Sequence, residues 1–492
     1  MPITVLTNVF RALRLRKARR SRRWLLLLCC SGLISGCAHF HSRPLSPRMT
    51  AAAFDARSLN NSGLRTFLAA NHVTAPPPGG TWNLKALTLA AIYYQPVLAE
   101  ARARLLAAQA AQITAGERPN PSLSVTPGYD AGVAGATSPW IVPLRLDWTI
   151  ETAGKRSDRM AQARERAGAA RWKLIGTVWQ VRSRVRAALL DLYVARRLDE
   201  LLSREASTRR TVVRLLDEQF AAGSVSSYVV EQARTALSST ILAQQAAAGR
   251  ASQARVRLAE ALGLPLHALQ GARLSFAPFK TFPLQLTRAE IRQKALLNRA
   301  DVRAALDEYA ASQAALQLQI ALQYPDIHLG PGYAWNAQLA GDSEWSIGLG
   351  LSLPILNRNQ GPIAEAKARR ELAAARFLSV QARAIAEIDG ALAAYRAARE
   401  RMATAALLLA SLHKQTDSIH AQVEAGELQP LDYANAQVAL DVGARRRLGA
   451  EVQAQQALGR LELAVESPLT LSPMALHRAQ FDMPRAQKRT SP

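Results

Sequence analysis

Two stretches of this sequence join a short strand pattern to the start of a very long helical segment. In Trp140–Arg156 apolar residues alternate with polar ones and a Gly-bearing turn follows, and Glu344–Ile363 repeats that arrangement. Alternation over roughly 10 residues gives a strand one apolar face and one polar or very small face. Such a strand suits a wall with lipid on one side and a wet lumen on the other. The two stretches therefore predict membrane strands that continue into long helices outside the lipid.

The alternation also assigns side chains to the two faces of these strands. On the polar face, expected to line a lumen, are Arg145, Asp147 and Thr149. On the apolar face, expected to meet lipid, are Leu144, Trp148, Trp345 and Leu349.

The composition favours long helices over a compact enzyme. The 492 residues carry a net charge of +25, only 6% are aromatic, and Ala, Leu, Arg and Gln dominate. Lys and Arg are spread along the helical segments and are not gathered with stacking aromatics, which argues against a nucleic-acid binder. Among the eight histidines only His413 and His420 could share a helix face, and no Cys, Met or acidic cluster joins them. The sequence predicts no enzyme, no cofactor and no metal site.

The N-terminus resembles a bacterial lipoprotein signal. Residues 1–36 contain eight basic and no acidic residues. The basic residues precede an apolar run of about 11 residues within the same segment, which is too short for a permanent membrane helix. Ile34–Cys37 resembles a lipobox, in which the cysteine is acylated and becomes the new N-terminus. Cleavage there would leave Cys37 as the one thiol and a net charge of +17. An ordinary signal peptide with an incidental cysteine is the alternative.

An internal repeat of about 200 residues organises the rest of the chain. Pro127-Gly128-Tyr129 matches Pro331-Gly332-Tyr333 at an offset of 204, and Gly223 matches Gly426 at 203. We expect a signal peptide at 1–36, a lipidated, extended arm at 37–80, a first repeat at 81–265, a linker and second repeat at 266–467, and a disordered tail at 468–492. The expected strands are at about 122–129, 141–150, 326–335 and 344–355, and the tip turns at about 221–227 and 424–430.

The lengths of the segments fit one another. The long helices, from Arg156 to Gly223 and from Gly361 to Gly426, span 67 and 65 residues, or roughly 100 Å at 1.5 Å per residue. A returning helix at about 225–262 and an entering helix at about 84–117 would together match one long helix. Four strands per chain cannot close a barrel, and open edges are not tolerated in lipid. Copies must pool their strands, and two or three copies are both compatible with the sequence.

These features together resemble the TolC family of outer-membrane efflux proteins over nearly all of the mature chain. Ile150–Arg156 and Leu353–Ile363 are similar to the branch that serves cobalt–zinc–cadmium and copper–silver pumps. The resemblance implies a mainly helical fold with a small β part, in which each copy is helix–strand–strand–long helix–turn–helix. It implies a homotrimer whose 12-stranded outer-membrane β-barrel continues into a long periplasmic α-helical barrel.

The resemblance also assigns a role to the two tip turns, which would dock a periplasmic membrane-fusion adaptor and narrow the pore. The tip residues are Gly223, Ser224, Val225, Gly426, Glu427 and Leu428. Asp432 follows the second turn and would either form a pore constriction or act as a helix cap. Val229 stands at the corresponding place after the first turn, which weakens any ion-paired closure there.

The lipobox and the resemblance together imply an outer-membrane lipoprotein that forms the exit duct of a tripartite efflux system, with heavy-metal cations as cargo. Its partners would be the adaptor, an inner-membrane RND pump and outer-membrane lipid, without nucleic acid. A drug-efflux or type I secretion duct of the same family is the alternative. A coiled-coil envelope scaffold or adhesin is the alternative from another class, but it would not need four amphipathic strands in two copies.

Overall fold

The computed structural model describes residues 38–77, 79–129, 131–132, 139–283, 287–336 and 342–469. The expected signal peptide, Cys37 and almost all of the expected tail lie outside these residues. The chain divides into two units, 1–56 and 57–492. In the first unit the described residues hold one helix, α2 (Pro47–Asp55), with Pro47 in its first turn. A proline is tolerated there because the amide it lacks would have no partner inside the helix.

The expectation of an extended arm over residues 37–80 is wrong. Besides α2, this segment contains α3 (Ser62–Ala70) at the start of the second unit. The Asn61 side chain caps α3 by accepting a hydrogen bond from the Leu64 amide at 3.1 Å. Leu64, Phe67 and Leu68 are buried in the core. Two helices of nine residues are too short to give a clear periodic signal among the surrounding prolines.

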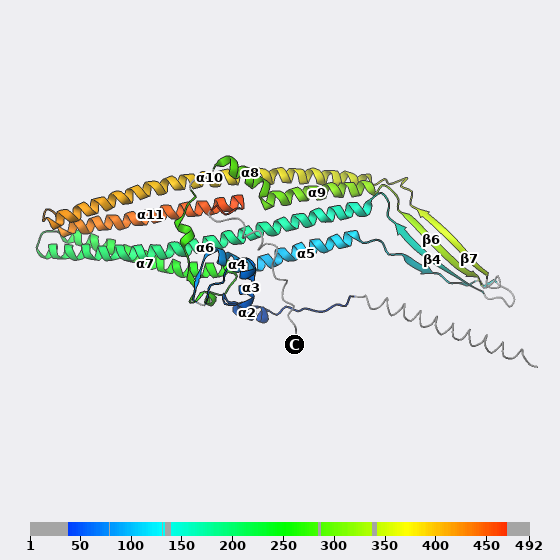
Figure 1. Ribbon diagram of the computed structural model, residues 1–492, viewed down its shortest axis with the longest axis horizontal. Coiled ribbons are helices and arrows are strands. Elements are labelled where there is room, and N and C mark those ends of the chain that lie inside the picture. The colour runs from blue at the N-terminus through cyan, green and yellow to red at the C-terminus, as the bar shows by residue number, and fades with distance from the viewer. Residues whose placement is uncertain are drawn as a thin grey trace, which may run out of the picture. The chain divides into compact units, whose positions relative to one another are not determined.

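The second unit contains the two copies of the repeat (Figure 1). The first copy consists of α4 (Leu84–Tyr94), α5 (Pro96–Gly116), β2 (Ser122–Val125), β3 (Gly128–Tyr129), β4 (Trp140–Ile150), α6 (Lys155–Ala221) and α7 (Ser227–Leu262). The second consists of α8 (Arg288–Asn298), α9 (Ala300–Ala321), β6 (Ile327–Asn336), β7 (Asp342–Leu351), α10 (Gln360–Glu424) and α11 (Pro430–Val465). Between them lie η1 (Leu266–Leu269), β5 (Arg273–Leu274) and η2 (Ala277–Lys280), and β5 pairs in parallel with β1 (Thr81–Trp82).

Each entering helix is interrupted, where the sequence predicted one continuous helix at about 84–117. Pro96 breaks the first one, since it disfavours helical backbone at Gln95. The Gln95 side chain donates to the carbonyls of Glu260 and Ala261 at the end of α7. Arg299 occupies the matching break in the second copy and donates to the Ala464 carbonyl at the end of α11. In both copies, the residue at the break therefore caps the end of the returning helix.

Each copy buries its own apolar cluster. The first cluster joins α3, α4, α6 and α7 and includes Leu87, Leu189 and Leu258, while the second joins α8, α10 and α11 around Ile388 and Leu458. The two copies meet along α6, which contacts both α9 and α11. The helices run side by side, with the turns α6–α7 and α10–α11 at one end and the strands at the other (Figure 1).

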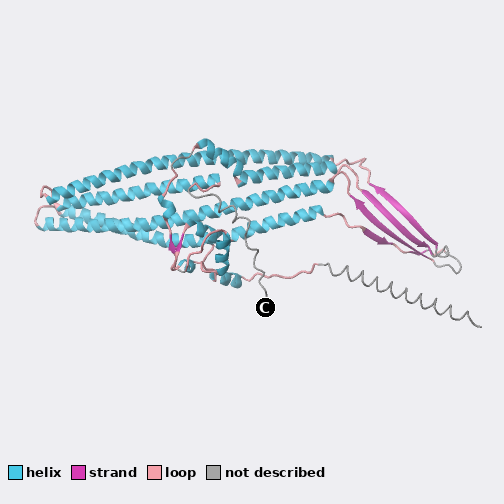
Figure 2. Cartoon of the chain, in the orientation of Figure 1, coloured by secondary structure: helices cyan, strands magenta, loops and turns pink. Residues whose placement is uncertain are grey.

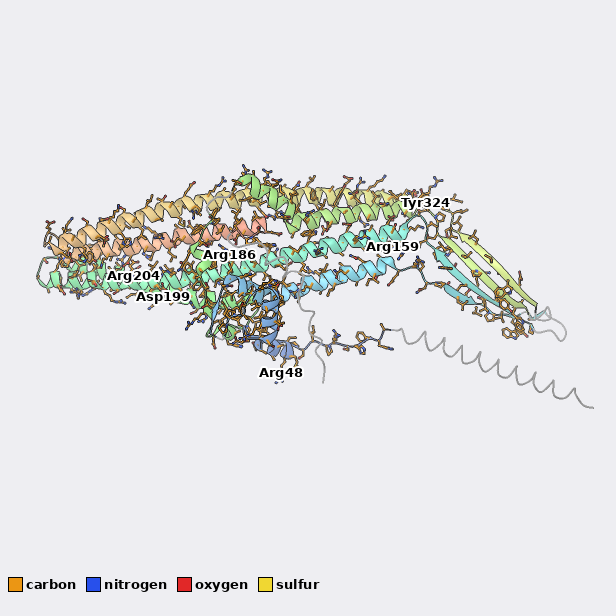
Figure 3. All side chains as sticks on the ribbon, viewed as in Figure 1. Arg48, Arg159, Arg186, Asp199, Arg204 and Tyr324 are labelled. Carbon is orange, nitrogen blue, oxygen red and sulfur yellow. The ribbon has the colours of Figure 1, made fainter. Side chains whose placement is uncertain are left out.

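Buried ionic groups lie along the contact between α6 and α11. Arg182 and Arg186 on α6 surround Glu462 on α11, with an Arg182–Glu462 distance of 3.1 Å, and the Glu462 side chain is 1% exposed. Arg186, which is labelled in Figure 3, also donates to the Gln455 carbonyl at 2.8 Å. Burial lowers the pKa of Arg186, although the charge of Glu462 acts in the opposite direction. Nearer the tips, the buried Glu205 pairs with Arg445 of α11 at 2.7 Å.

The sheet has the order β2–β4–β6–β7, with β3 also paired to β4, and every pair is antiparallel (Figure 2). Its two open edges are therefore β2–β3 and β7. β7 ends at Leu351, four residues before the predicted end of the strand at 355. The reason is that β6 begins at Ile327, opposite Leu351, so the described part of this chain provides no partner strand for residues 352–355.

Candidate functional site

The sheet separates the predicted lipid-facing side chains from the predicted lumen-facing ones. Leu144 lies opposite Tyr333, and Tyr333 lies opposite Trp345. Trp148 lies opposite Leu329, and Leu329 lies opposite Leu349. Residues directly opposite each other share a face, so these residues form one apolar face. Arg145, Asp147 and Thr149 alternate with them and lie on the other face.

The apolar face of the sheet is open to the surroundings of the single chain. Trp345, Ile347 and Leu349 are 79%, 81% and 74% exposed. Further exposed members are Leu123, Val125, Tyr129, Trp140, Leu144, Trp148, Ile150, Trp335 and Leu351. An apolar surface of this extent is unusual for a protein in water and marks a surface that lipid or another protein covers.

The polar face of the sheet carries hydrophilic or very small residues. Asp147 lies 3.3 Å from the imidazole of His328, and the Thr149 hydroxyl lies 3.4 Å from the same ring nitrogen. Across the β6–β7 pair the polar face carries Gly330 opposite Gly348 and Gly332 opposite Ser346. His328 was not among the residues predicted for this face, although its place between Ile327 and Leu329 gives the necessary alternation.

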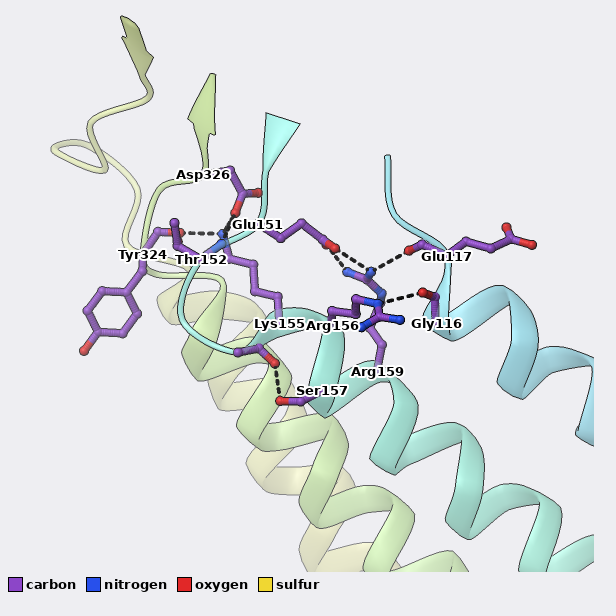
Figure 4. A network of polar contacts seen from close by, with 11 residues as sticks. Gly116, Glu117, Glu151, Thr152, Lys155, Arg156, Ser157, Arg159, Tyr324 and Asp326 are labelled. Carbon is purple, nitrogen blue, oxygen red and sulfur yellow. Dashed lines mark hydrogen bonds and ion pairs between the residues drawn. The ribbon is translucent and has the colours of Figure 1, made fainter. Parts of the chain in front are cut away.

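The first strand–helix junction is held by polar contacts to the turn between α9 and β6 (Figure 4). The ammonium group of Lys155 donates to the Asp326 carboxylate at 2.6 Å and to the Tyr324 carbonyl at 2.7 Å. Thr152 donates to the same turn, from its amide to Asp326 and from its hydroxyl to the Pro325 carbonyl. Burial alone would raise the pKa of Asp326, but the hydrogen bonds from Lys155 and Thr152 and the charge of Lys155 hold it below its ordinary value.

The other side of this junction contacts the end of α5. Arg159 pairs with Glu151 and also donates to the Glu117 carbonyl. Arg156 donates to the Gly116 carbonyl at 2.6 Å. The hydrogen bond to Glu151 raises the pKa of Arg159, which keeps this guanidinium charged. These contacts connect the start of α6 to the end of α5 and to the loop that precedes α6.

The second junction, between β7 and α10, is more open. Gly154 and Asn359 are the equivalent helix-capping residues of the two junctions, and both have positive φ, of 76° and 60°. Asn359 donates to the Gln319 carbonyl at 2.7 Å. A cavity of about 470 Å³ lies beside the start of α10 and is lined by Gln323, Ile355, Leu356, Arg358, Gln360, Ile363, Ala364 and Lys367.

Both tip turns use a glycine with left-handed backbone, as the sequence predicted for their positions. Gly223 and Gly426 have φ of 71° and 75°. After each glycine the next residue's amide closes the turn, Ser224 to the Gln219 carbonyl and Glu427 to the Gln422 carbonyl, both at 2.9 Å. The bonds follow the pattern of a Schellman motif, which satisfies the last carbonyls of a helix.

The remaining predicted tip residues lie close together at the same end of the helices. Val225 packs against a small cluster that includes Val212, Leu216 and Val230. The Leu428 amide donates to Gln422, as does that of Glu427. The Gln219 amide group donates to the Gln429 side chain at 2.8 Å, which joins the two turns of one chain.

Asp432 forms part of a capping box at the start of α11. Its carboxylate accepts a hydrogen bond from the Gln429 amide at 3.0 Å. This contact corresponds to the helix-cap alternative that the sequence left open. Val229 occupies the matching place in the first turn and cannot accept such a bond.

The described residues lack two further features. No group of three or more His, Cys, Asp or Glu side chains there is placed to hold a metal ion. Within that same part of the chain, no helix combines the length and apolar character that crossing a membrane requires.

Comparison with curated proteins identifies two distant relatives. The chain is 25% identical over 300 residues to the pyoverdine export outer membrane protein OpmQ of Pseudomonas aeruginosa, covering 57% of this chain and 63% of OpmQ. The chain thus spans slightly less than two thirds of that relative. It is 25% identical over 318 residues to the cobalt-zinc-cadmium resistance protein CzcC of Cupriavidus metallidurans, covering 64% of this chain and 74% of CzcC.

Comparison with solved structures supports the fold. The crystal structure of CusC, described in relation to transmembrane channel formation, superposes with a TM-score of 0.63 at 20% sequence identity. That match covers 87% of this chain and 99% of CusC. The likeness includes the mainly helical architecture with few strands.

The family model for outer membrane efflux proteins matches the chain twice, over residues 90–264 and 291–465. Each match covers one copy of the internal repeat, from its entering helix to the end of its returning helix. The two matches together cover well over half of the sequence. The chain therefore belongs to the outer membrane efflux protein family and is an outer-membrane protein.

Proposed function

We propose that this chain forms the outer-membrane exit duct of a tripartite efflux system and exports heavy-metal cations. One observation carries the proposal: a sheet with an exposed apolar face and two open edges continues, through two junctions, into helices of 67 and 65 residues. Lipid covers the apolar face, and the long helices carry the conduit into the periplasm. The protein conducts its cargo and is not an enzyme.

The open edges of the sheet support assembly from several copies. An unpaired strand edge in lipid leaves backbone N–H and C=O groups without partners, at a cost of several kcal/mol for each group by rough estimate. A homotrimer closes the edges into a 12-stranded barrel, and its helices form the periplasmic barrel. Arg145, Asp147 and Thr149 then line the lumen, and Leu144, Trp148, Trp345 and Leu349 face lipid.

The two tip turns are the proposed docking site for a periplasmic adaptor. Gly223, Ser224, Gly426 and Glu427 are exposed at the end of the helices, opposite to the strands. An RND pump in the inner membrane supplies the energy through that adaptor. Asp432 of each copy contributes to the pore constriction while it caps α11, since one carboxylate can serve both purposes.

The metal cargo rests on the similarity to CzcC, a cobalt-zinc-cadmium resistance protein. The similarity to OpmQ, a pyoverdine export protein, favours a second candidate, an organic solute. The two relatives have the same identity to this chain, so a test of cargo has to include both classes. In this proposal, the acyl chains carried by Cys37 anchor the duct in the outer membrane.

A deletion strain tests the cargo directly. We expect loss of the gene to lower tolerance to cobalt, zinc or cadmium, and we expect the wild-type chain to restore it. Organic antimicrobials and pyoverdine serve as the comparison cargo. Unchanged tolerance to every metal, together with lost tolerance to organic compounds, would replace the first candidate by the second.

A further inference from the structure

The duplication of this chain contains information about how one copy contacts the next. Inside the chain, the first copy of the repeat pairs with the second through β4 and β6. The second copy has the corresponding free edge on β7, and the first copy has its free edge on β2 and β3. In a closed ring, β7 of one molecule meets β2 and β3 of the next, which repeats the β4–β6 contact between molecules.

The offset between the copies is constant along the strands. Leu123 pairs with Leu146, and Ile327, 204 residues after Leu123, pairs with Leu351, 205 residues after Leu146. Tyr129 pairs with Trp140, and Tyr333 pairs with Trp345 at the same two offsets. The strands of the two copies therefore correspond residue for residue, with 204 separating β2–β3 from β6 and 205 separating β4 from β7.

We infer that β7 of one copy pairs with β2 and β3 of a second copy in the register that these offsets transfer from β4 and β6. Trp148 opposite Leu329 becomes Leu353 opposite Val125, and Leu144 opposite Tyr333 becomes Leu349 opposite Tyr129. Likewise Ile150 opposite Ile327 becomes Ile355 opposite Leu123. The inference deepens the proposed function and rests on it, since it needs several copies around one barrel.

The side chains agree with this register. Each transferred pair joins two apolar residues on one face, and Gly350 meets Gly128 on the other. A slip by one residue would set Leu353 against Ser124 and turn the apolar side chains of one strand toward the polar side chains of the other. A slip by two residues would keep the faces matched. The alternation of apolar and polar residues therefore excludes only slips by an odd number of residues. The β4–β6 contact selects one register among the even ones.

The register also accounts for the strand end that the single chain lacks. The apolar alternation of β7 continues through Leu353 and Ile355, which are 65% and 71% exposed. Among the described residues of their own chain they have no partner strand, because β6 begins at Ile327. In the transferred register they lie opposite β2 of the second copy, so residues 352–355 extend β7 in the assembly.

The polar junction provides an independent observation. Lys155 and Asp326 form an ion pair at the β4–α6 junction, with the Lys155 side chain 4% exposed. The corresponding residues are Gln360, 205 positions after Lys155, and Ser122, 204 positions before Asp326. Both corresponding residues are neutral. This is expected if Gln360 of one copy meets Ser122 of the next copy at the second junction. A lone lysine or aspartate would lose its partner on burial, whereas an amide and a hydroxyl can hydrogen-bond to each other.

Cysteine pairs test the register in the full-length chain. The variant L353C/V125C should form disulfides between copies under mild oxidation and give covalent trimers on a non-reducing gel. L349C/Y129C should do the same from the middle of the strand. Cβ atoms directly opposite in a sheet are about 4.5–5.5 Å apart, within reach of a disulfide after small shifts. The pair W148C/L329C is the matched control, because its disulfide should form within one chain and leave the protein at the mass of a single chain on the gel.

The alternatives give different results. L353C/S124C tests the slip by one residue, and L353C/L123C and L353C/P127C test slips by two in either direction. If one of these pairs cross-links a trimer in preference to L353C/V125C, the inferred register is wrong, but the proposed function as a duct is unaffected. If all pairs fail and the unmodified protein purifies from the outer membrane as a monomer, the assembly itself is overturned, and the proposed function fails with it.

Discussion

The ammonium group of Lys155 lies 2.6 Å from the Asp326 carboxylate and joins the end of β4 to the start of β6. Asp326 is 28% exposed, while Lys155 is almost fully buried. The buried ammonium group is therefore paired with a carboxylate that is itself accessible to water.

We expect D326A to destabilise the folded chain by roughly 2 kcal/mol, below the range for a fully buried pair because water can still reach the site. The double variant K155Q/D326S, which copies the residues of the second junction, should be milder than D326A. Thermal unfolding in detergent measures both. A double variant that is as unstable as D326A would show that the two junctions are not interchangeable.

Glu462 should be essential to the contact between α6 and α11. E462A leaves Arg182 and Arg186 buried without their carboxylate, at an expected cost of about 3–5 kcal/mol. E200A is the matched control, since Glu200 pairs with Arg197 on the exposed side of α6, and such pairs contribute at most about 1 kcal/mol. Equal midpoints of thermal unfolding for the two variants would contradict this assignment.

The stability of the joint between α11 and α9 should depend on pH. Burial raises the pKa of Glu466 to about 7, and the charge of Asp301 adds to the effect, while the hydrogen bond from the Ala300 amide and the charge of Arg299 oppose it. Because the folded pKa lies above the ordinary value of 4.5, the contribution of Glu466 is fully present below pH 4.5 and is lost as pH rises through 7.

The variant E466Q should therefore be more stable than the wild type at pH 8 and similar to it at pH 4.5. The glutamine carbonyl can still accept the Ala300 amide, so the cap remains. Unfolding midpoints measured across this range test the prediction. A constant difference between the two proteins at every pH would mean that Glu466 does not titrate in this window.

Gly263 and Gly426 should respond differently to alanine although their backbones are alike. Both have positive φ, at 71° and 75°, so each substitution carries a conformational cost of about 1 kcal/mol. At Gly263 the added Cβ would also lie 3.1 Å from the Tyr94 carbonyl carbon, whereas at Gly426 nothing lies within 4 Å. G263A should therefore be the less stable variant by roughly a further 1 kcal/mol. Chemical denaturation of the two variants under one condition ranks them.

The two faces of the sheet should tolerate charge unequally. L349R places a cation on the apolar face, where arginine costs about 2–4 kcal/mol near the middle of a bilayer. S346R places the same side chain on the polar face of the same strand and should be tolerated much better. The fraction of each variant recovered in the outer membrane distinguishes them. Equal recovery would remove the assignment of lipid to the Leu349 face.

The long elements could be predicted because local patterns determine them. The alternation around Trp148 defines β4, and the absence of proline after Arg156 defines α6 up to the glycine turn at Gly223. The resemblance to the family is confirmed by the two matches of its model.

Features that depend on distant partners could not be predicted. The break at Arg299 has no proline and exists because its side chain reaches Ala464, 165 residues later. The ion pair of Arg182 with Glu462 joins positions 280 residues apart, and nothing in either local sequence marks it. The capping contact of Asp432 was one of two alternatives in the sequence, and it depends on the position of the Gln429 amide, which no local pattern gives.

The uneven distribution of charge along α6 and α11 has a mechanical consequence. Arg182 and Arg186, near the middle of α6, surround the buried Glu462 close to the C-terminal end of α11. At the tips, an exposed hydrogen bond joins the side chains of Gln219 and Gln429 beside a small apolar cluster that includes Val212 and Ala434. We therefore expect that separating the two halves of a molecule costs less free energy at the tip turns than at the buried contact of Arg182 and Arg186 with Glu462. In each subunit, the hairpins α6–α7 and α10–α11 should be able to move apart at their tip turns while they stay in contact at the buried ion pair.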